Sequence, residues 1–158
     1  MGLPRRKPNR LKNYDYSQNC AYFITICVKE RHELLCQIVG GDAHIDPCVQ
    51  LSEYGMVADK YIRGVTGIDK YVIMPNHIHM IICVYGGDGT MRASSPTQSI
   101  SQLIKSFKIL VTKQIGFSLW QRSFHDHIIR SQQEYQKIWE YIDTNPLKWA
   151  DDCFYEKV

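Results

Sequence analysis

Two histidines separated by a single residue open an apolar run. His77 and His79 precede Met80–Val84 and directly follow a Pro75-Asn76 turn signal. Side chains alternate between the two faces of a β-strand, so both imidazoles point the same way, about 6.5–7 Å apart at the backbone. At this spacing they can converge on one metal ion. The alternative is an ordinary hydrogen-bonded or solvated pair at a sheet edge, because burying them without partners is costly.

A tyrosine and an asparagine share one side of the last predicted helix. An apolar stripe that includes Tyr135 and Ile142 is expected to pack on the sheet. Tyr141 lies about 110° from the centre of that stripe, and Asn145 follows one turn later on the same side. A hydroxyl and an amide oxygen therefore project together from the edge of a packed helix. An exposed tyrosine and a helix-terminal asparagine with no special role are the plain alternative.

The elements that must position these residues alternate along the chain. Strands are expected over residues 21–28, 69–74, 77–84 and 119–130, and helices over 51–63, 100–115 and 131–145. The first six elements match the βαββαβ plan of a ferredoxin-like α+β fold, an antiparallel sheet with helices on one face. The seventh is an additional C-terminal helix that carries Tyr141. The segment 30–47, with Gly40-Gly41-Asp42, is expected to be a loop.

The composition describes one ordinary domain. The chain has 158 residues, 44% hydrophobic and 22% charged, which is typical of a soluble globular protein. We expect a basic arm over 1–20, a single domain over 21–150 and a short tail over 151–158. No apolar run is long enough to cross a bilayer, and Met1–Lys12 lacks the apolar core of a secretory signal. We therefore expect a cytoplasmic protein without a membrane partner, its six cysteines reduced.

Three motifs in order resemble one known family. They are Met74-Pro-Asn-His-Ile-His-Met80, Trp120-Gln-Arg-Ser-Phe-His-Asp-His-Ile-Ile-Arg130 and Tyr141-Ile-Asp-Thr-Asn-Pro-Leu-Lys148. Together they resemble the REP-associated tyrosine transposases, which are relatives of the HUH single-tyrosine nucleases and of small insertion-sequence transposases. The resemblance runs from about residue 22 to 149.

The resemblance implies a metal-dependent reaction on DNA. His77, His79 and Asn145 would hold Mg²⁺ or Mn²⁺, and Tyr141 would attack a DNA phosphate, forming a covalent 5′-phosphotyrosine bond and leaving a free 3′-hydroxyl. Two imidazoles and an amide bind Mg²⁺ weakly, so the DNA phosphate and water must complete the coordination. A phenol with a pKa of about 10 is a poor nucleophile until it is activated. The sequence identifies no base that would do this.

The implied substrate is single-stranded DNA beside a hairpin, including REP-like palindromes. The net charge of +3 is too mild to indicate DNA binding by itself. Basic residues of the arm and of one helix face, which could equally be solvated, are candidates for phosphate contacts. These candidates are Arg5, Arg6, Lys7, Lys105, Lys108, Lys113 and Arg122. The implied enzyme acts near the nucleoid, as a monomer or a homodimer.

A second histidine pair, His125 and His127, flanks Asp126. The resemblance places no metal ligand there, and we interpret the pair as structural or close to DNA. A hairpin-binding protein that has lost cleavage is the main alternative function. A histidine-triad nucleotide hydrolase would need a third histidine at Ile81. An RNA-binding βαββαβ module would need aromatic residues on its strands in a pattern that this chain lacks.

Overall fold

The computed structural model describes residues 20–40, 46–84 and 99–155, so the predicted basic arm, with Arg5, Arg6 and Lys7, lies outside the described residues. Its strands are β1 (Cys20–Cys27), β2 (Cys36–Val39), β3 (Cys48–Leu51), β4 (Ile68–Ile73), β5 (His77–Val84) and β6 (His125–Ile129). Its helices are α1 (Glu53–Ile62), α2 (Ile100–Ile115) and α3 (Gln132–Thr144), with short 3₁₀ helices η1 (Lys29–Arg31) and η2 (Asn145–Asp151).

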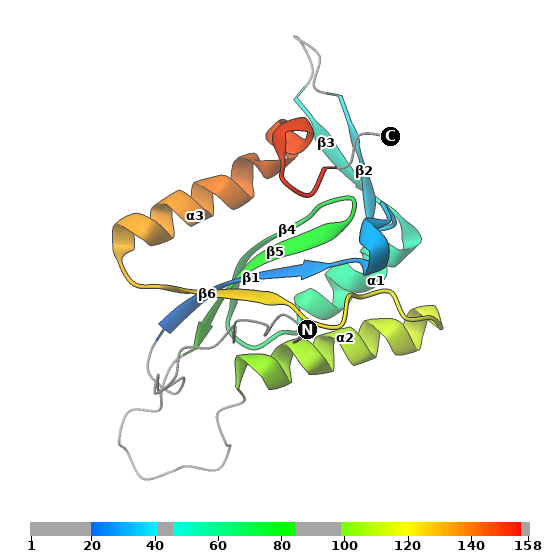
Figure 1. The fold of residues 1–158 in the computed structure, drawn as a ribbon, viewed down its shortest axis with the longest axis horizontal. Helices are drawn as coiled ribbons and strands as arrows, with labels where there is room; N and C mark the ends of the chain where they lie inside the picture. Colours follow the sequence, from blue (N-terminus) through cyan, green and yellow to red (C-terminus); the bar gives the residue numbers. More distant parts are fainter. Residues whose placement is uncertain (1–19, 41–45, 85–98, 156–158) are drawn as a thin grey trace, which may run out of the picture.

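The main sheet has the strand order β4-β5-β1-β6, and each neighbouring pair is antiparallel. This order confirms the predicted α+β ferredoxin-like plan. Helices α1 and α2 lie on one face of the sheet, and α3 lies on the other (Figure 1). The fold therefore places β5, which carries the two histidines, inside the sheet and between layers.

The two faces of the sheet are packed differently. Against α1 and α2, the sheet buries a continuous apolar core that includes Tyr22, Ile78 and Phe107. Against α3, a smaller cluster gathers around Ile81, Ile129 and Ile142. The α3 face is less apolar because alternation along β5 gives two of its positions to histidines. The polar candidate residues thus lie on the less apolar of the two faces.

Local signals place α3 as expected. The hydroxyl oxygen of Ser131 accepts a hydrogen bond from the backbone N–H of Glu134, as an N-cap should. The Glu134 carboxylate accepts from the N–H of Arg130, one residue earlier than in a standard capping box. The α-helix ends at Thr144, but Asn145 keeps helical dihedral angles although it precedes a proline, and the chain continues into η2 with Pro146 in its first turn.

Polar contacts hold α3 against β4. The Lys70 ammonium lies 2.5 Å from the Asp143 carboxylate and 3.5 Å from the centre of the Trp139 ring. The Tyr135 hydroxyl donates to Asp69. These contacts fix which side of the helix faces the sheet, and so where Tyr141 projects.

Two expectations about secondary structure were wrong. The segment 30–47 is not all loop, because β2 and β3 pair as an antiparallel hairpin. Glycine-rich segments such as Gly40-Gly41-Asp42 favour loops and hairpin connections alike, so the sequence did not distinguish the two. The predicted strand over 119–130 forms pairs only at its end, over β6, and Trp120 makes an isolated bridge with Val28. No helix in the described parts of the chain is long and apolar enough to cross a membrane.

Candidate functional site

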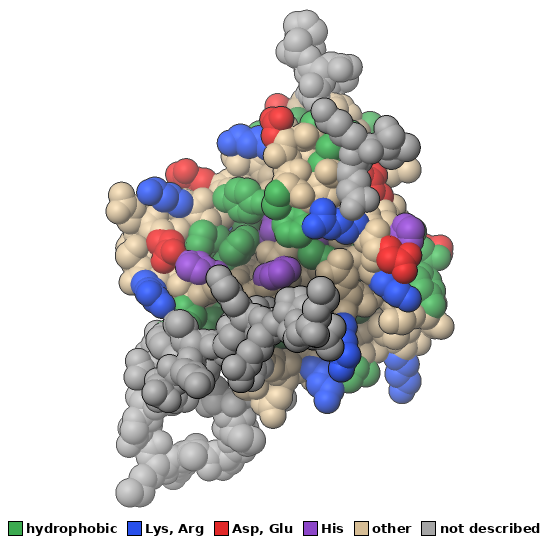
Figure 2. All heavy atoms as spheres, in the orientation of Figure 1, with side chains coloured by type: hydrophobic (Ala, Val, Ile, Leu, Met, Phe, Trp, Pro, Cys, Tyr) green, Lys and Arg blue, Asp and Glu red, His purple; other side chains and the backbone are tan. Residues whose placement is uncertain are grey.

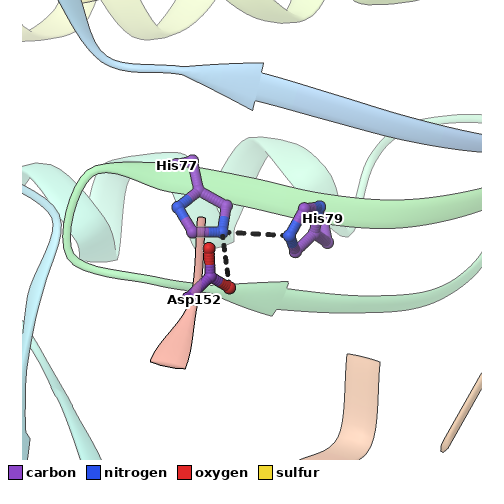
Figure 3. Close-up of side chains that lie close together, drawn as sticks. All are labelled: His77, His79 and Asp152. Atoms are coloured by element: carbon purple, nitrogen blue, oxygen red, sulfur yellow. Dashed lines mark hydrogen bonds and ion pairs between the residues drawn. The ribbon is translucent and has the colours of Figure 1, made fainter. Parts of the chain in front are cut away.

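His77 and His79 meet on the α3 face of β5. Their Nε2 atoms are 3.0 Å apart, and the two residues are 0% and 2% exposed (Figure 3). The Nδ1–H of His77 donates to the Asn76 side-chain oxygen at 2.8 Å, and the Asn76 amide nitrogen in turn donates to the Phe154 carbonyl. This chain of hydrogen bonds leaves the His77 Nε2 lone pair free to face His79, an arrangement typical of metal-binding histidines.

A hydroxyl on the neighbouring strand orients the second ring. Thr25 stands opposite His79 in the β1–β5 register, and its Oγ1 lies 2.8 Å from His79 Nδ1. Burial lowers the pKa of His77 to about 3, with a further lowering by Arg31. Burial also lowers the pKa of His79 to about 3, with His77 adding to the shift and Asp152 opposing it. Both rings are therefore neutral near pH 7, and neutral imidazole is the form that binds a metal ion.

Asp152 is a third convergent group that the sequence reasoning missed. Its Oδ2 atom lies 4.0 Å from His77 Nε2, and its side chain is 2% exposed. Ligand atoms of His77, His79 and Asp152 all lie within 4.8 Å of one another (Figure 3). The carboxylate reaches the histidines because η2 turns the chain back after α3. Asp152 belongs to the segment 151–158, which the sequence predicts to be a tail. No sequence spacing relates it to the two histidines.

Tyr141 and Asn145 complete the cluster. The Tyr141 hydroxyl is 3.3 Å from His79 Nε2 and 3.5 Å from Asp152 Oδ2. The amide nitrogen of Asn145 donates to the same carboxylate oxygen at 2.9 Å. The four residues singled out as nucleophile and ligands thus lie together within one chain.

The donor set fits a divalent cation. The side-chain oxygen of Asn145 is buried and has no hydrogen-bond partner, which is costly unless another group satisfies it. Two neutral imidazole nitrogens and a buried carboxylate converge beside it. Such a mixture of nitrogen and hard oxygen donors suits Mn²⁺, and its oxygen atoms also suit Mg²⁺. A cation at this place would satisfy the Asn145 oxygen and offset the carboxylate charge.

Tyr141 is the most accessible member of the cluster. Its side chain borders a cavity of about 300 Å³ that is also lined by Asn145, Lys148 and Asp152. Burial raises the pKa of Tyr141 to about 12, and the Asp152 carboxylate contributes to the shift. The phenol is therefore protonated near neutral pH, although it is 41% exposed. A cation bound by Asp152 would weaken the carboxylate's share of this effect.

Aromatic rings enclose the histidines. The Phe154 and Trp149 rings lie 4.5 and 5.9 Å from the His77 ring, centroid to centroid. Phe23 stacks on His79 at 5.2 Å and meets Tyr141 edge-on at 6.1 Å. These contacts hold both imidazoles in fixed orientations and exclude water from them.

The predicted phosphate contacts are not gathered at this cluster. Lys105 and Lys113 are exposed on α2, which packs on the opposite face of the sheet. The Lys108 ammonium donates to the backbone carbonyls of Gln121 and Ser123, each at 2.9 Å, and burial lowers its pKa to about 8. A phosphate would have to compete with these carbonyls. Arg122 is exposed just before β6.

The second histidine pair lies in a different environment. His125 and His127 are exposed on the edge strand β6. His127 Nε2 is 2.7 Å from a carboxylate oxygen of Glu134. The ring partner of His127 is thus a carboxylate, whereas the His77 and His79 rings contact each other.

No protein-family model matches the chain. A Haemophilus influenzae protein, described only as uncharacterized, is 33% identical in an alignment that covers 98% of this chain and 95% of its own length. Among solved structures, a REP-associated tyrosine transposase bound to a REP hairpin superposes with a TM-score of 0.57. That match is 22% identical and covers 94% of this chain and 74% of the other, and it shows a shared fold.

Proposed function

The chain belongs to the same family as the Haemophilus influenzae protein. We propose, from the geometry of its candidate site, that it is a metal-dependent DNA transposase or nicking-and-joining enzyme whose nucleophile is Tyr141. The observation that carries the proposal is the approach of the Tyr141 hydroxyl to His79, 3.3 Å, beside an unsatisfied Asn145 oxygen. A tyrosine hydroxyl next to neutral, convergent metal ligands suits phosphoryl transfer better than any structural role.

His77, His79 and Asp152 would hold Mg²⁺ or Mn²⁺, with the Asn145 oxygen as a further ligand. When bound, the cation supplies charge stabilisation to a phosphoryl oxygen, an effect of several kcal/mol in general. Asn76 and Thr25 orient the two rings from behind. Asn145 has a second task, because its amide nitrogen positions the Asp152 carboxylate.

The Tyr141 oxygen attacks phosphorus, and the bond from phosphorus to the 3′-oxygen breaks. The products are a 5′-phosphotyrosine bond and a 3′-hydroxyl, whose oxygen takes its proton from water as it leaves. Asp152 Oδ2 accepts a hydrogen bond from the Tyr141 hydroxyl, which places it to receive the phenol proton. Lys148 lines the same cavity and would contact the neighbouring phosphate. The reverse reaction rejoins a strand without an external energy source, because the phosphotyrosine bond conserves the phosphodiester energy.

The substrate we propose is single-stranded DNA next to a hairpin. The fold shared with a transposase that was solved with a REP hairpin supports this substrate class. If cleavage has been lost, the same fold would serve as a hairpin-binding protein, and this outcome is separated from the first by the test below.

Incubation with Mn²⁺ and a labelled single strand joined to a hairpin should produce a covalent protein–DNA adduct that survives denaturing electrophoresis. Tyr141→Phe should abolish the adduct and keep DNA binding. Tyr135→Phe is the matched control, because Tyr135 lies on the same helix with its hydroxyl on Asp69, and it should keep the adduct. An adduct that persists in Tyr141→Phe, or that forms equally in a chelator, contradicts the proposed chemistry. If the wild type binds the DNA but forms no adduct, the result supports the alternative, a hairpin-binding protein that has lost cleavage.

A further inference from the structure

Helix α3 covers the sheet face on which the candidate site lies more fully over β4 and β5 than over β1 and β6. It packs over β4 and β5, where Lys70 and Asp69 hold it. Toward β1 and β6 the cover is incomplete: Ile129 of β6 is buried with Ile142 of α3, but Phe23 is partly exposed and His125 is exposed. Figure 2 shows hydrophobic side chains and histidines gathered on this face between α3 and β6.

Three residues connect the reactive groups to the edge of the sheet. Thr25 is paired in register with His79 on one side and with His125 on the other. Phe23, two residues earlier on the same strand, faces the same way and contacts both His79 and Tyr141. We call Phe23, Thr25 and His125 the open strip, because Phe23 is partly exposed and His125 is exposed, while Thr25 between them is buried. It starts at the reactive groups and ends at an exposed histidine on the edge strand.

The chemistry of the open strip suits unpaired bases. Phe23 is partly exposed and His125 is exposed, so each offers a planar ring next to the site. Exposed cations, Arg122 and Arg130, lie just before and just after β6. The nearby Glu134 carboxylate is engaged by His127 and by the N–H of Arg130. Aromatic rings with cations beside them are the usual platform for a single strand, whose bases are free to stack.

We propose that the open strip binds the single strand next to the phosphate that Tyr141 attacks, with one base stacked on Phe23 and its neighbour on His125. The location rests on the proposed function, since the strand must pass the nucleophile. The binding itself does not depend on cleavage and is measured without it. Stacking tolerates many base types, so the open strip holds the strand without specifying its sequence.

The test is fluorescence anisotropy of a labelled oligothymidylate of about 12 nucleotides, with the full chain in a chelator so that no cleavage occurs. Phe23→Ala should weaken binding about fivefold to a hundredfold, the range found when one stacking ring is removed. His125→Ala should weaken it by a smaller factor, and Phe23→Tyr should bind close to the wild type. Phe117→Ala is the matched control, an aromatic ring 42% exposed beside Tyr54 of α1, and it should change nothing.

If Phe23→Ala does not fold, Phe23→Leu tests the stacking instead, because leucine fills the same space without offering a flat ring. Weak binding by Phe23→Leu supports the proposal, and wild-type binding by it overturns the proposal. Equal losses in Phe23→Ala and Phe117→Ala would also overturn it. If the wild type forms no adduct but the Phe23 variants still bind the oligonucleotide poorly, the proposed cleavage fails and the open strip stands. If the adduct forms and Phe23→Ala binds normally, only the open strip fails.

Discussion

The molecule carries two histidine pairs with the same spacing and opposite surroundings. His77 and His79 are buried on an internal strand with their Nε2 atoms 3.0 Å apart. His125 and His127 are exposed on an edge strand, and His127 is paired with Glu134. Alternation along a strand gives each pair a common direction, but it does not make a metal site. The place of the strand in the sheet, and what packs on it, makes the difference.

Removing one histidine from each pair should affect metal binding very differently. His79→Ala should lower the affinity for Mn²⁺ by more than about a hundredfold, since it deletes a ligand rather than a supporting partner. His127→Ala, the matched control, should leave the affinity unchanged. Isothermal titration with Mn²⁺ measures both. Equal losses in the two variants would mean that the buried pair is not the metal site.

The next test concerns the partner that orients the buried pair. Asn76→Ala removes the acceptor of the His77 Nδ1–H and the link to the Phe154 carbonyl. We expect the affinity for Mn²⁺ to fall about tenfold to a hundredfold, as for other outer-shell partners of metal-binding histidines. The same titration measures it, and Asn76→Asp, which keeps an acceptor oxygen, should recover most of the loss. A variant that binds as the wild type does would rule out this orienting role.

Acid should destabilise the metal-free protein through the buried pair. Their pKa values lie near 3, whereas the ordinary value is 6.5. Between these values the unfolded chain binds protons that the native state does not, so their contribution to stability is full above about pH 6.5 and falls as the pH drops toward 3. The slope is about 1 kcal/mol per pH unit for each histidine. Urea unfolding from pH 7 to 4 should show a shallower slope for His77→Gln/His79→Gln, and an unchanged slope would refute this account.

The smallest effect should come from the exposed pair. Glu134→Gln weakens its contact with His127 while keeping an acceptor for the N–H of Arg130. Because exposed ion pairs contribute little, the thermal midpoint measured by calorimetry should hardly move. A large drop would show that the β6 edge matters more to the fold than its exposure indicates.

Much of the site could be predicted because its parts are local. Strand alternation aligned His77 with His79, and helical periodicity placed Asn145 one turn beyond Tyr141. The βαββαβ order followed from apolar periodicity, which strands and helices of this length display clearly. These inferences needed no knowledge of which segments pack together.

Asp152 and Lys108 show what could not be predicted. Asp152 joins the site only because η2 reverses the chain, and this turn depends on packing of Trp149 and Phe154 against His77. Lys108 looked like one member of an exposed basic face, yet its ammonium binds two carbonyls of the segment before β6. Both depend on contacts between distant segments, which single-residue patterns do not encode.

The distances along the chain between the site's parts also matter for biosynthesis. Tyr141 is 62 residues from His79, and the Asn76 contact with Phe154 spans 78 residues. Contacts with such long sequence separation form late, because closing a long loop costs conformational entropy before the contact stabilises the fold. A chain still emerging from the ribosome can therefore form β1 and β5 and have no nucleophile beside its histidines. Under the proposed function, the ability to cut DNA would arise only after the segment that carries Tyr141 and Asp152 has been made, so shorter nascent chains would lack it.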